Sequence, residues 1–299
     1  MPRTSPPTER VVATVNLLAE RPDASLSLAE LTRRLGVNKS TGHAILASLT
    51  AAGWVLRDPT SKTYRLGPAM VALGRQAGAS FPALDFARAA LVELSREFAA
   101  TCAALGVGDD AVTVLDQVAD PRAAPHAFRV GATFPLRPPL GAAVVAWSSD
   151  AVRDDWLAHV PPDTRAHYTE ALAATHARGF AVEIASTPVA RVRELAGMLG
   201  DDDTSARAAL DRLADELAAR EEFLAVDLDP DLEYAVNVVN APVFDHTGHV
   251  TLVLSLTGFA RALRGTDVHA AGDALVHATR RITDALTPTS PTPARTPVS

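Results

Sequence analysis

The sequence has 299 residues and a formal net charge of −7, with 47% hydrophobic and 21% charged residues. This length is about twice the ~150-residue prior for one domain, so we expect two domains with enough apolar material for buried cores. No apolar run approaches the ~20 residues of a membrane-spanning helix, and the first residues lack the apolar stretch of a secretory signal. The single cysteine, Cys102, excludes an internal disulfide and is typical of a reducing compartment. The composition therefore predicts a cytoplasmic protein without a membrane partner.

The charge is distributed unevenly along the chain. Residues 1–75 contain ten Lys and Arg against five acidic residues, whereas residues 76–299 have a net charge of −12. A basic head on an acidic body favours a polyanionic partner for the head. A chance imbalance of surface charge gives the same count, so charge alone does not decide between the two interpretations.

The first two predicted helices carry clear start and stop signals. An apolar stripe at helical spacing predicts a helix over residues 8–21. A second helix starts at Ser27, whose hydroxyl can accept from the amide of Glu30 while the carboxylate of Glu30 reaches back to the amide of Ser27. This helix ends at Gly36, which suits the left-handed conformation of a helix terminus.

A third helix and a hairpin complete the pattern of the head. Asn38 is the expected N-cap of a helix from residue 39 to about residue 52. Two strand-like runs follow, over residues 54–57 and 63–66. A helix-turn-helix followed by a β-hairpin is a winged helix. A small helical packing module also needs caps and glycine stops, but it does not need a basic hairpin directly after the third helix.

The rest of the chain predicts an α+β domain around an antiparallel sheet, because strand-like runs alternate with turns and helices. The expected strands are residues 102–106, 111–118, 126–130, 235–243 and 250–257. The expected helices are residues 83–100, 141–148, 151–158, 164–178 and 268–286. The boundaries that follow are a winged helix at 8–67, a linker helix at 68–82, a second domain at 83–286, and disordered ends at 1–7 and 287–299.

The start of the third helix has the composition of a DNA-reading element. In a helix-turn-helix the N-terminal residues of this helix enter the major groove, and its open amides suit phosphate oxygens. The chain contains only two lysines, one at this helix start and one at the hairpin tip, whereas a merely solvated face would have them scattered. The candidate DNA-binding residues are Ser27, Asn38, Lys39, Ser40, Thr41, His43, Lys62 and Arg65.

Several short segments carry a resemblance to a known family. Those of the head are 35–41 (LGVNKST), 46–49 (LASL), 52–55 (AGWV) and 64–68 (YRLGP). Those of the body are 130–131 (VG), 134–136 (FPL), 140–143 (LGAA), 178–182 (RGFAV), 240–245 (NAPVFD) and 254–258 (LSLTG). Together they extend from about residue 9 to residue 286, and in this order they resemble the IclR family of transcriptional regulators.

This resemblance implies a winged helix, a linker helix and a GAF-like effector domain that binds a small molecule, with an organic acid as the expected effector. It also implies a homodimer or a dimer of dimers on partly palindromic operators in double-stranded DNA, with repression as the commoner mode. The other hypothesis is a metabolite-binding or catalytic domain that has kept a vestigial DNA-binding head.

The resemblance also places the effector site. Ser255 and Thr257 fall where family members have hydroxyls that face the ligand, and Val238 lies near a position that can be polar. Arg137 can pair with a carboxylate, and the amides of a helix start favour an anion. The candidate effector-binding residues are Arg137, Gly141, Ala142, Asp227, Asp229, Asp231, Val238, Ser255 and Thr257. The hydroxyls can equally belong to a sheet surface, and the aspartates to an exposed acidic loop.

Two departures from the family pattern stand out. The reading helix has Ala44 where the family often has arginine, which leaves the bases that are read undetermined. Residues 183–230 intervene where the family commonly has a short acidic loop, and they include an amphipathic helix predicted over residues 204–222. This insertion can cover the pocket, mediate assembly, or simply pack on the domain surface.

Signals for an enzyme are weak. Neither lysine follows a glycine, which excludes a P-loop, and there is no Gly-x-Ser-x-Gly nucleophile elbow. His246 and His249 are too few to form a zinc site, and Cys102 has the surroundings of an inert buried thiol. We therefore expect neither catalysis nor a metal or cofactor.

Overall fold

The computed structural model describes residues 5–19, 25–78, 81–126, 128–184, 218–219 and 223–286. The chain divides after residue 80 into two compact units. Among the residues described, no helix has both the length and the apolar composition to cross a membrane.

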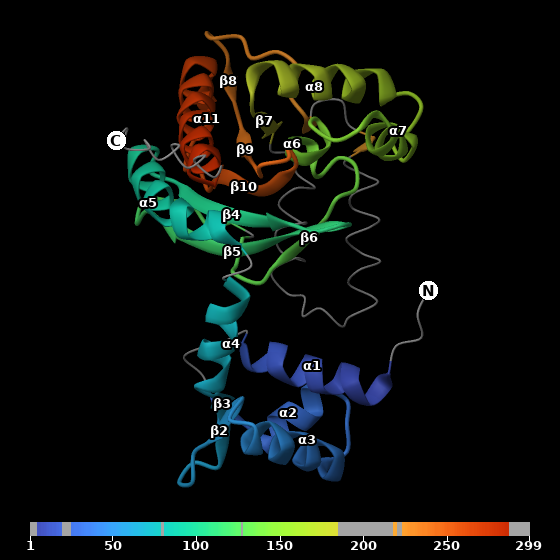
Figure 1. The fold of residues 1–299 in the computed structure, drawn as a ribbon, viewed down its shortest axis with the longest axis vertical. Helices are drawn as coiled ribbons and strands as arrows, with labels where there is room; N and C mark the ends of the chain where they lie inside the picture. Colours follow the sequence, from blue (N-terminus) through green and yellow to red (C-terminus); the bar gives the residue numbers. More distant parts are fainter. Residues whose placement is uncertain are drawn as a thin grey trace, which may run out of the picture. The chain divides into compact units, whose positions relative to one another are not determined.

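The first unit is a winged helix-turn-helix followed by a separate helix (Figure 1). Its elements are α1 (Pro6–Ala19), β1 (Leu26–Ser27), α2 (Leu28–Arg34), α3 (Lys39–Ala51), β2 (Val55–Arg57), β3 (Thr63–Leu66) and α4 (Ala69–Gly78). The three strands form an antiparallel sheet in the order β1-β3-β2. The predicted winged helix is confirmed.

The head folds around the capping and apolar signals of its sequence. Both hydrogen bonds of the capping box between Ser27 and Glu30 are present at the start of α2. Gly36 ends the turn after α2 with a φ of 63°, a conformation that costs glycine little. Leu31 and Leu46 are buried between α2 and α3 in the small core of the head.

Two details of the head differ from the prediction. Helix α1 begins at Pro6 rather than at residue 8, since proline is tolerated in a first helical turn. Strand β1 was not predicted, because two residues are too few to show alternation. The predicted turn at residues 22–24 lies outside the described residues.

The second unit is built on a six-stranded antiparallel sheet in the order β6-β5-β4-β10-β9-β7. The strands are β4 (Thr101–Val107), β5 (Ala111–Ala119), β6 (Thr133–Pro135), β7 (Ala181–Ile184), β9 (Val236–Phe244) and β10 (Val250–Thr257). A small separate ladder joins β8 (Glu233–Tyr234) and β11 (Leu263–Arg264). The helices are α5 (Pro82–Glu97), α6 (Ala142–Val145), α7 (Asp150–Ala158), α8 (Arg165–Arg178) and α11 (Gly265–Leu286).

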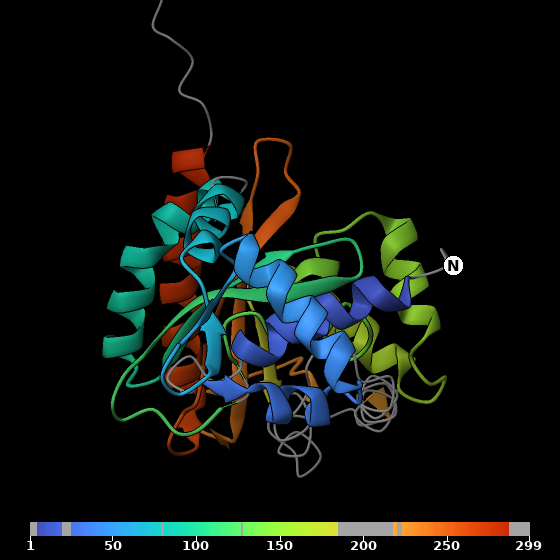
Figure 2. The same cartoon turned by 90° about the horizontal axis from the view of Figure 1, so that it is seen from below.

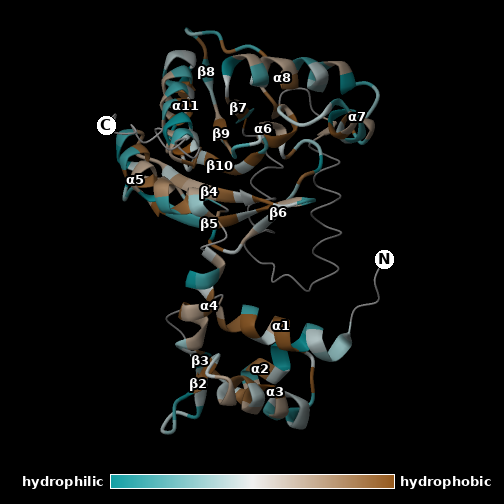
Figure 3. Ribbon diagram, viewed as in Figure 1, coloured by the Kyte–Doolittle hydropathy of each residue, from teal (hydrophilic) through white to brown (hydrophobic). Residues whose placement is uncertain are grey.

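Helices cover both faces of this sheet and create two cores. Figure 2 shows α5 and α11 side by side, and Leu91 and Leu275 from these helices pack with Leu254 of β10. On the opposite face, Trp156 and Tyr168 of α7 and α8 belong to the second core. Hydropathy alternates along α8 and α11 in Figure 3, as expected for helices with one buried face. The α+β class is confirmed.

One predicted strand is wrong. Residues 126–130 were expected to form a strand, but the described residues of this range have no strand conformation. On the side of β5 away from β4, the pairing partner is instead β6, since Thr113 of β5 pairs with Thr133. The edge strands β6 and β7 escaped prediction because they have only three and four residues. Apart from residues 218–219, the helix expected over 204–222 lies outside the described residues.

Candidate DNA interface and effector pocket

Asn38 organises the start of α3. Its Oδ1 accepts hydrogen bonds from the backbone N–H of Thr41 and from the hydroxyl of Ser40, each at 2.8 Å. The first amides of an α-helix have no partner within the helix, so this end carries partial positive charge. The cap therefore presents an ordered, electropositive helix terminus.

One face of α3 is free of the protein core. Lys39, Ser40 and His43 are exposed, and the exposed face continues through Ala44 and Ala47. Leu46 and Leu49 lie on the other side and are buried in the core of the head. The exposed residues recur at helical spacing, so they form a single outward surface.

Gly42 brings α3 close to α2. A Cβ at this position would lie 2.3 Å from Cγ2 of Thr32, a distance that real atoms do not tolerate. The Thr32 hydroxyl donates to the carbonyl of Leu28 at 2.9 Å, which fixes its side chain. The angle at which α3 is presented thus depends on a glycine.

The hairpin between β2 and β3 places Lys62 at its tip. Lys62 has a φ of 55°, and its N–H donates to the carbonyl of Asp58 at 3.0 Å. The Asp58 carboxylate accepts from the amides of Thr60 and Ser61, and these bonds lower its pKa. The tip is therefore an ordered turn with an exposed lysine.

The predicted DNA-binding residues fall into two groups. Lys39, Ser40, His43, Lys62 and Arg65 are exposed. The others have roles within the fold as well. Thr41 is half-buried, Asn38 is engaged as the cap, and the hydroxyl of Ser27 donates to Glu30 at 2.7 Å.

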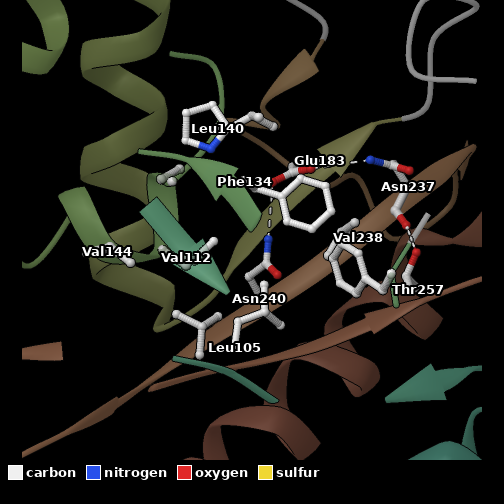
Figure 4. A pocket seen from close by; sticks show the side chains of 16 residues that line it. Leu105, Val112, Phe134, Leu140, Val144, Glu183, Asn237, Val238, Asn240 and Thr257 are labelled. Atoms are coloured by element: carbon white, nitrogen blue, oxygen red, sulfur yellow. Dashed lines mark hydrogen bonds between the residues drawn. The ribbon is translucent and has the colours of Figure 1, made fainter. Parts of the chain in front are cut away.

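The second unit contains a pocket between the sheet and the segment that leads into α6. Its volume is about 80 Å³, several times the ~10–15 Å³ that one water molecule needs. Most of its wall is apolar, formed by side chains such as Phe128, Phe134 and Leu140. Figure 4 shows a polar group at one side of the pocket, consisting of Glu183, Asn237, Asn240 and Thr257.

Glu183 is the centre of the polar wall. Its Oε2 accepts from Nδ2 of Asn237 at 3.3 Å, and its Oε1 accepts from Nδ2 of Asn240 at 3.2 Å. The Ser255 hydroxyl donates to Oδ1 of Asn240 at 2.5 Å, and that of Thr257 donates to the carbonyl of Asn237 at 2.9 Å. Ser255 thus holds the carboxamide of Asn240, and Thr257 holds the backbone of Asn237, while both carboxamides aim an N–H at one carboxyl.

A β-bulge makes this arrangement possible. Along β7 and β9, Glu183 pairs with Val238 while the next pair is Ile184 with Val236, so Asn237 is an extra residue. Such a bulge redirects side chains that strict alternation would send to opposite faces. Asn237 and Asn240, three residues apart, therefore both reach Glu183.

The environment of Glu183 favours its neutral form. The residue is 7% exposed, and burial raises the pKa of its carboxyl to about 7, although the bonds from the two asparagines oppose this rise. No Lys, Arg or His contributes to the pocket wall that the described residues form. The site is therefore an apolar pocket with one carboxyl poised near neutral pH.

The structure brings together some of the predicted effector residues. Gly141, Ala142, Val238 and Thr257 line the pocket, while Ser255 lies behind Asn240 and is fully buried. Arg137 does not line it. Likewise, Asp227, Asp229 and Asp231 are exposed and lie outside its lining.

Sequence reasoning missed three residues of the polar wall. Glu183, Asn237 and Asn240 were not among the candidates. The two asparagines interrupt an otherwise apolar strand, and this interruption was an available signal. Glu183 directly follows the 178–182 segment, but only strand pairing shows that it meets the asparagines.

Other groups with potential reactivity lie elsewhere. Cys102 is buried in β4, and burial raises the pKa of its thiol, which makes it a poor nucleophile. Within the described part of the chain, no three His, Cys, Asp or Glu side chains gather into a group that could hold a metal ion.

Ser255→Val is expected to lower the free energy of unfolding by about 1–3 kcal/mol, because it leaves the buried Oδ1 of Asn240 without its donor. Urea unfolding of the full chain measures this loss. Thr169→Val on the exposed side of α8 is the matched control and should stay within ~0.5 kcal/mol of wild type. Equal stabilities for the two variants would contradict the role given to Ser255.

Comparison with known proteins identifies the family. The sequence model of the IclR helix-turn-helix domain matches residues 7–59. The glycerol operon regulatory protein of Streptomyces griseus is 30% identical over 190 residues, which cover 60% of this chain and 73% of that relative. The chain belongs to the IclR family of transcriptional regulators.

Solved structures share the IclR fold. An IclR transcriptional regulator from Alicyclobacillus acidocaldarius matches with a TM-score of 0.61 at 21% identity, over 95% of this chain and all of the other. An IclR homologue from Microbacterium hydrocarbonoxydans, complexed with 4-hydroxybenzoate, matches with a TM-score of 0.59 at 15% identity, over 93% and 98% of the two chains. The resemblance seen in the sequence is confirmed.

Proposed function

We propose that this IclR regulator represses transcription as a homodimer or a dimer of dimers on a partly palindromic operator, and releases or retains it according to a small molecule bound in the second unit. The single observation that carries the DNA-binding part is the capped start of α3, with Lys39 and Ser40 exposed beside it. An electropositive helix terminus with short donors suits phosphates, and its exposed face suits the major groove.

The pocket supports the ligand-responsive part of this proposal. It is concave and mostly apolar, with a few oriented polar groups, as small-molecule sites generally are. A ligand can alter DNA binding only if it binds the competent and incompetent arrangements with different affinity. The homologue complexed with 4-hydroxybenzoate supports a small-molecule effector for this chain as well.

We propose that the pocket binds a small molecule and does not catalyse a reaction. Its described lining holds a carboxyl, two carboxamides and the hydroxyl of Thr257, which already donates to the carbonyl of Asn237 at 2.9 Å. None of the described lining residues is a Ser, Cys or Lys that would serve as a nucleophile. Turnover of a bound small molecule by the purified chain would favour instead a catalytic domain with a vestigial head.

DNA binding is tested by its dependence on salt. The logarithm of the affinity for the DNA upstream of the chain's own gene should fall linearly with the logarithm of the salt concentration, because neutralised phosphates release counterions. Lys39→Ala and Lys62→Ala should each reduce the slope by about 1, and the double variant by about 2. Fluorescence anisotropy at several salt concentrations measures this.

Arg261→Ala in the second unit is the control, since it also removes one exposed cation. It should leave the slope of log affinity against log salt unchanged. A double lysine variant with the wild-type slope would rule out this face of the head as the DNA interface.

A further inference from the structure

We propose that the pocket selects a compact molecule with an apolar body and a terminal hydroxyl or amino group, and discriminates against carboxylates and phosphates. The inference deepens the proposed function and rests on the pocket being the effector site. What carries it is the position of the Glu183 carboxyl, held by Asn237 and Asn240 at the side of an otherwise apolar pocket.

The hydrogen-bond inventory of the polar wall leaves acceptors for a ligand. An ionised carboxylate has about four lone-pair sites, whereas Glu183 receives one N–H from each asparagine. Oδ1 of Asn240 is already occupied by the hydroxyl of Ser255. An ionised Glu183 therefore accepts an O–H or N–H from a ligand, whereas a fully deprotonated acid has no proton to donate and can be held only after Glu183 itself takes up a proton.

No cation among the described lining residues would compensate an anionic ligand. Arg137, in the segment before α6, is not part of the lining. The guanidinium of Arg178 donates to the carbonyls of Phe180, Ala225 and Val226 at 2.7–3.0 Å, so it is committed to the backbone. A carboxylate or phosphate entering the pocket would meet the charge of Glu183 or force it to bind a proton.

The remaining wall limits the size of the ligand body. The volume of about 80 Å³ lies well below the ~300–1,000 Å³ of sites for drug-sized ligands, which favours a compact body. Phe128, Phe134 and Val112 offer apolar contact but no polar partner for a charged body. The organic acid expected from the sequence was to be held by Arg137 and by the amides at the start of α6. Arg137 is not in the lining, and α6 has only four residues, so few peptide dipoles add up at Gly141 and Ala142. The homologue complexed with 4-hydroxybenzoate holds a carboxylate, but at 15% identity its ligand chemistry is not carried over to this chain.

The test uses three probes with one four-carbon body, namely 1-butanol, butylamine and butyrate. Ligand-observed NMR titrations with the full chain at pH 8.5, where a carboxyl with a pKa of about 7 is mostly ionised, give their dissociation constants at constant ionic strength. We expect 1-butanol and butylamine to bind at least tenfold more tightly than butyrate. Glu183→Gln should weaken butylamine at least tenfold, while the control Glu170→Gln on the exposed side of α8 should not change it.

A pocket-filling variant separates failure of the ligand class from failure of the site. Val238→Phe, or Val253→Phe if the first does not fold, should abolish binding of all probes because both residues line the pocket. Butyrate binding that equals the other probes and is lost in this variant would overturn the ligand class but leave the effector site intact. Probe binding that survives in it would overturn the site itself. If neither 1-butanol nor butylamine binds at 20 mM, the ligand class is wrong.

Discussion

Glu183→Gln is expected to stabilise the ligand-free protein above pH 7 and to have little effect near pH 5. Burial raises the pKa of Glu183 from 4.5 to about 7, so the folded protein binds this proton more tightly than the unfolded chain does. The stabilisation from this proton is complete below pH 4.5 and is lost as the pH rises through about 7. Glutamine cannot titrate, so it avoids the cost of a buried charge.

The size of this effect follows from the shift. A change of one pKa unit corresponds to about 1.4 kcal/mol, and most of the shift titrates within this window, so the stability advantage of the variant should grow by about 2–3 kcal/mol between pH 5 and pH 8. Urea unfolding of wild type and variant at both pH values measures it. Subtracting wild type from variant removes the titration of groups that do not interact with Glu183. Tyr168 of α8 does interact with it, but burial and Glu183 raise the pKa of Tyr168 further, so it stays protonated over this pH range.

Glu170→Gln provides the control for the loss of one carboxylate. Glu170 is exposed on the same helix that carries Tyr168, and its removal should give no pH-dependent difference above ~0.5 kcal/mol. If the difference between Glu183→Gln and wild type is constant from pH 5 to pH 8, then Glu183 is ionised in the folded protein throughout this range.

Gly42→Ala should destabilise the head by about 1–3 kcal/mol, because its methyl group meets Thr32 of α2 at an impossible distance. The side chain of Thr32 is held by its bond to the carbonyl of Leu28, so the two helices must move apart. This separation changes the presentation of α3, and DNA affinity should fall together with stability. Hydrogen exchange of the amides in α2 and α3, followed by mass spectrometry of the full chain, locates the loss.

Gly74→Ala makes the same chemical change where there is space. A Cβ on Gly74 in α4 has no atom within 4 Å, and alanine is the better helix former by about 1 kcal/mol. The two variants should therefore have effects of opposite sign. A neutral or stabilising Gly42→Ala would show that α2 and α3 are not in close contact at this point.

Local signals predicted the head almost completely. The capping box of Ser27 and Glu30 and the N-cap Asn38 satisfy backbone N–H groups at helix starts, and Gly36 adopts the left-handed conformation after α2. Each acts within a few residues of itself, so its role can be recognised without knowledge of the fold. The lysines at the helix start and hairpin tip likewise depend only on local turns. The predicted winged helix was therefore confirmed, with shifts of a few residues at the element ends.

The effector pocket depends on contacts that are distant in sequence. Glu183 meets Asn237 and Asn240 across more than 50 residues, and a bulge rather than alternation decides which side chains share its face. The acidic candidates of the 227–231 segment are exposed and outside the lining, since charge in a sequence does not reveal which carboxylate the sheet will bury.

The sequence by itself determined the family, the winged helix and the surface expected to meet DNA, because helix caps, turns and exposed cations act over short distances. Only the tertiary structure decided which polar groups face the pocket and in what state of ionisation. Strand pairing buries one carboxyl between two carboxamides, and the resulting loss of hydration raises the pKa of Glu183 to about 7.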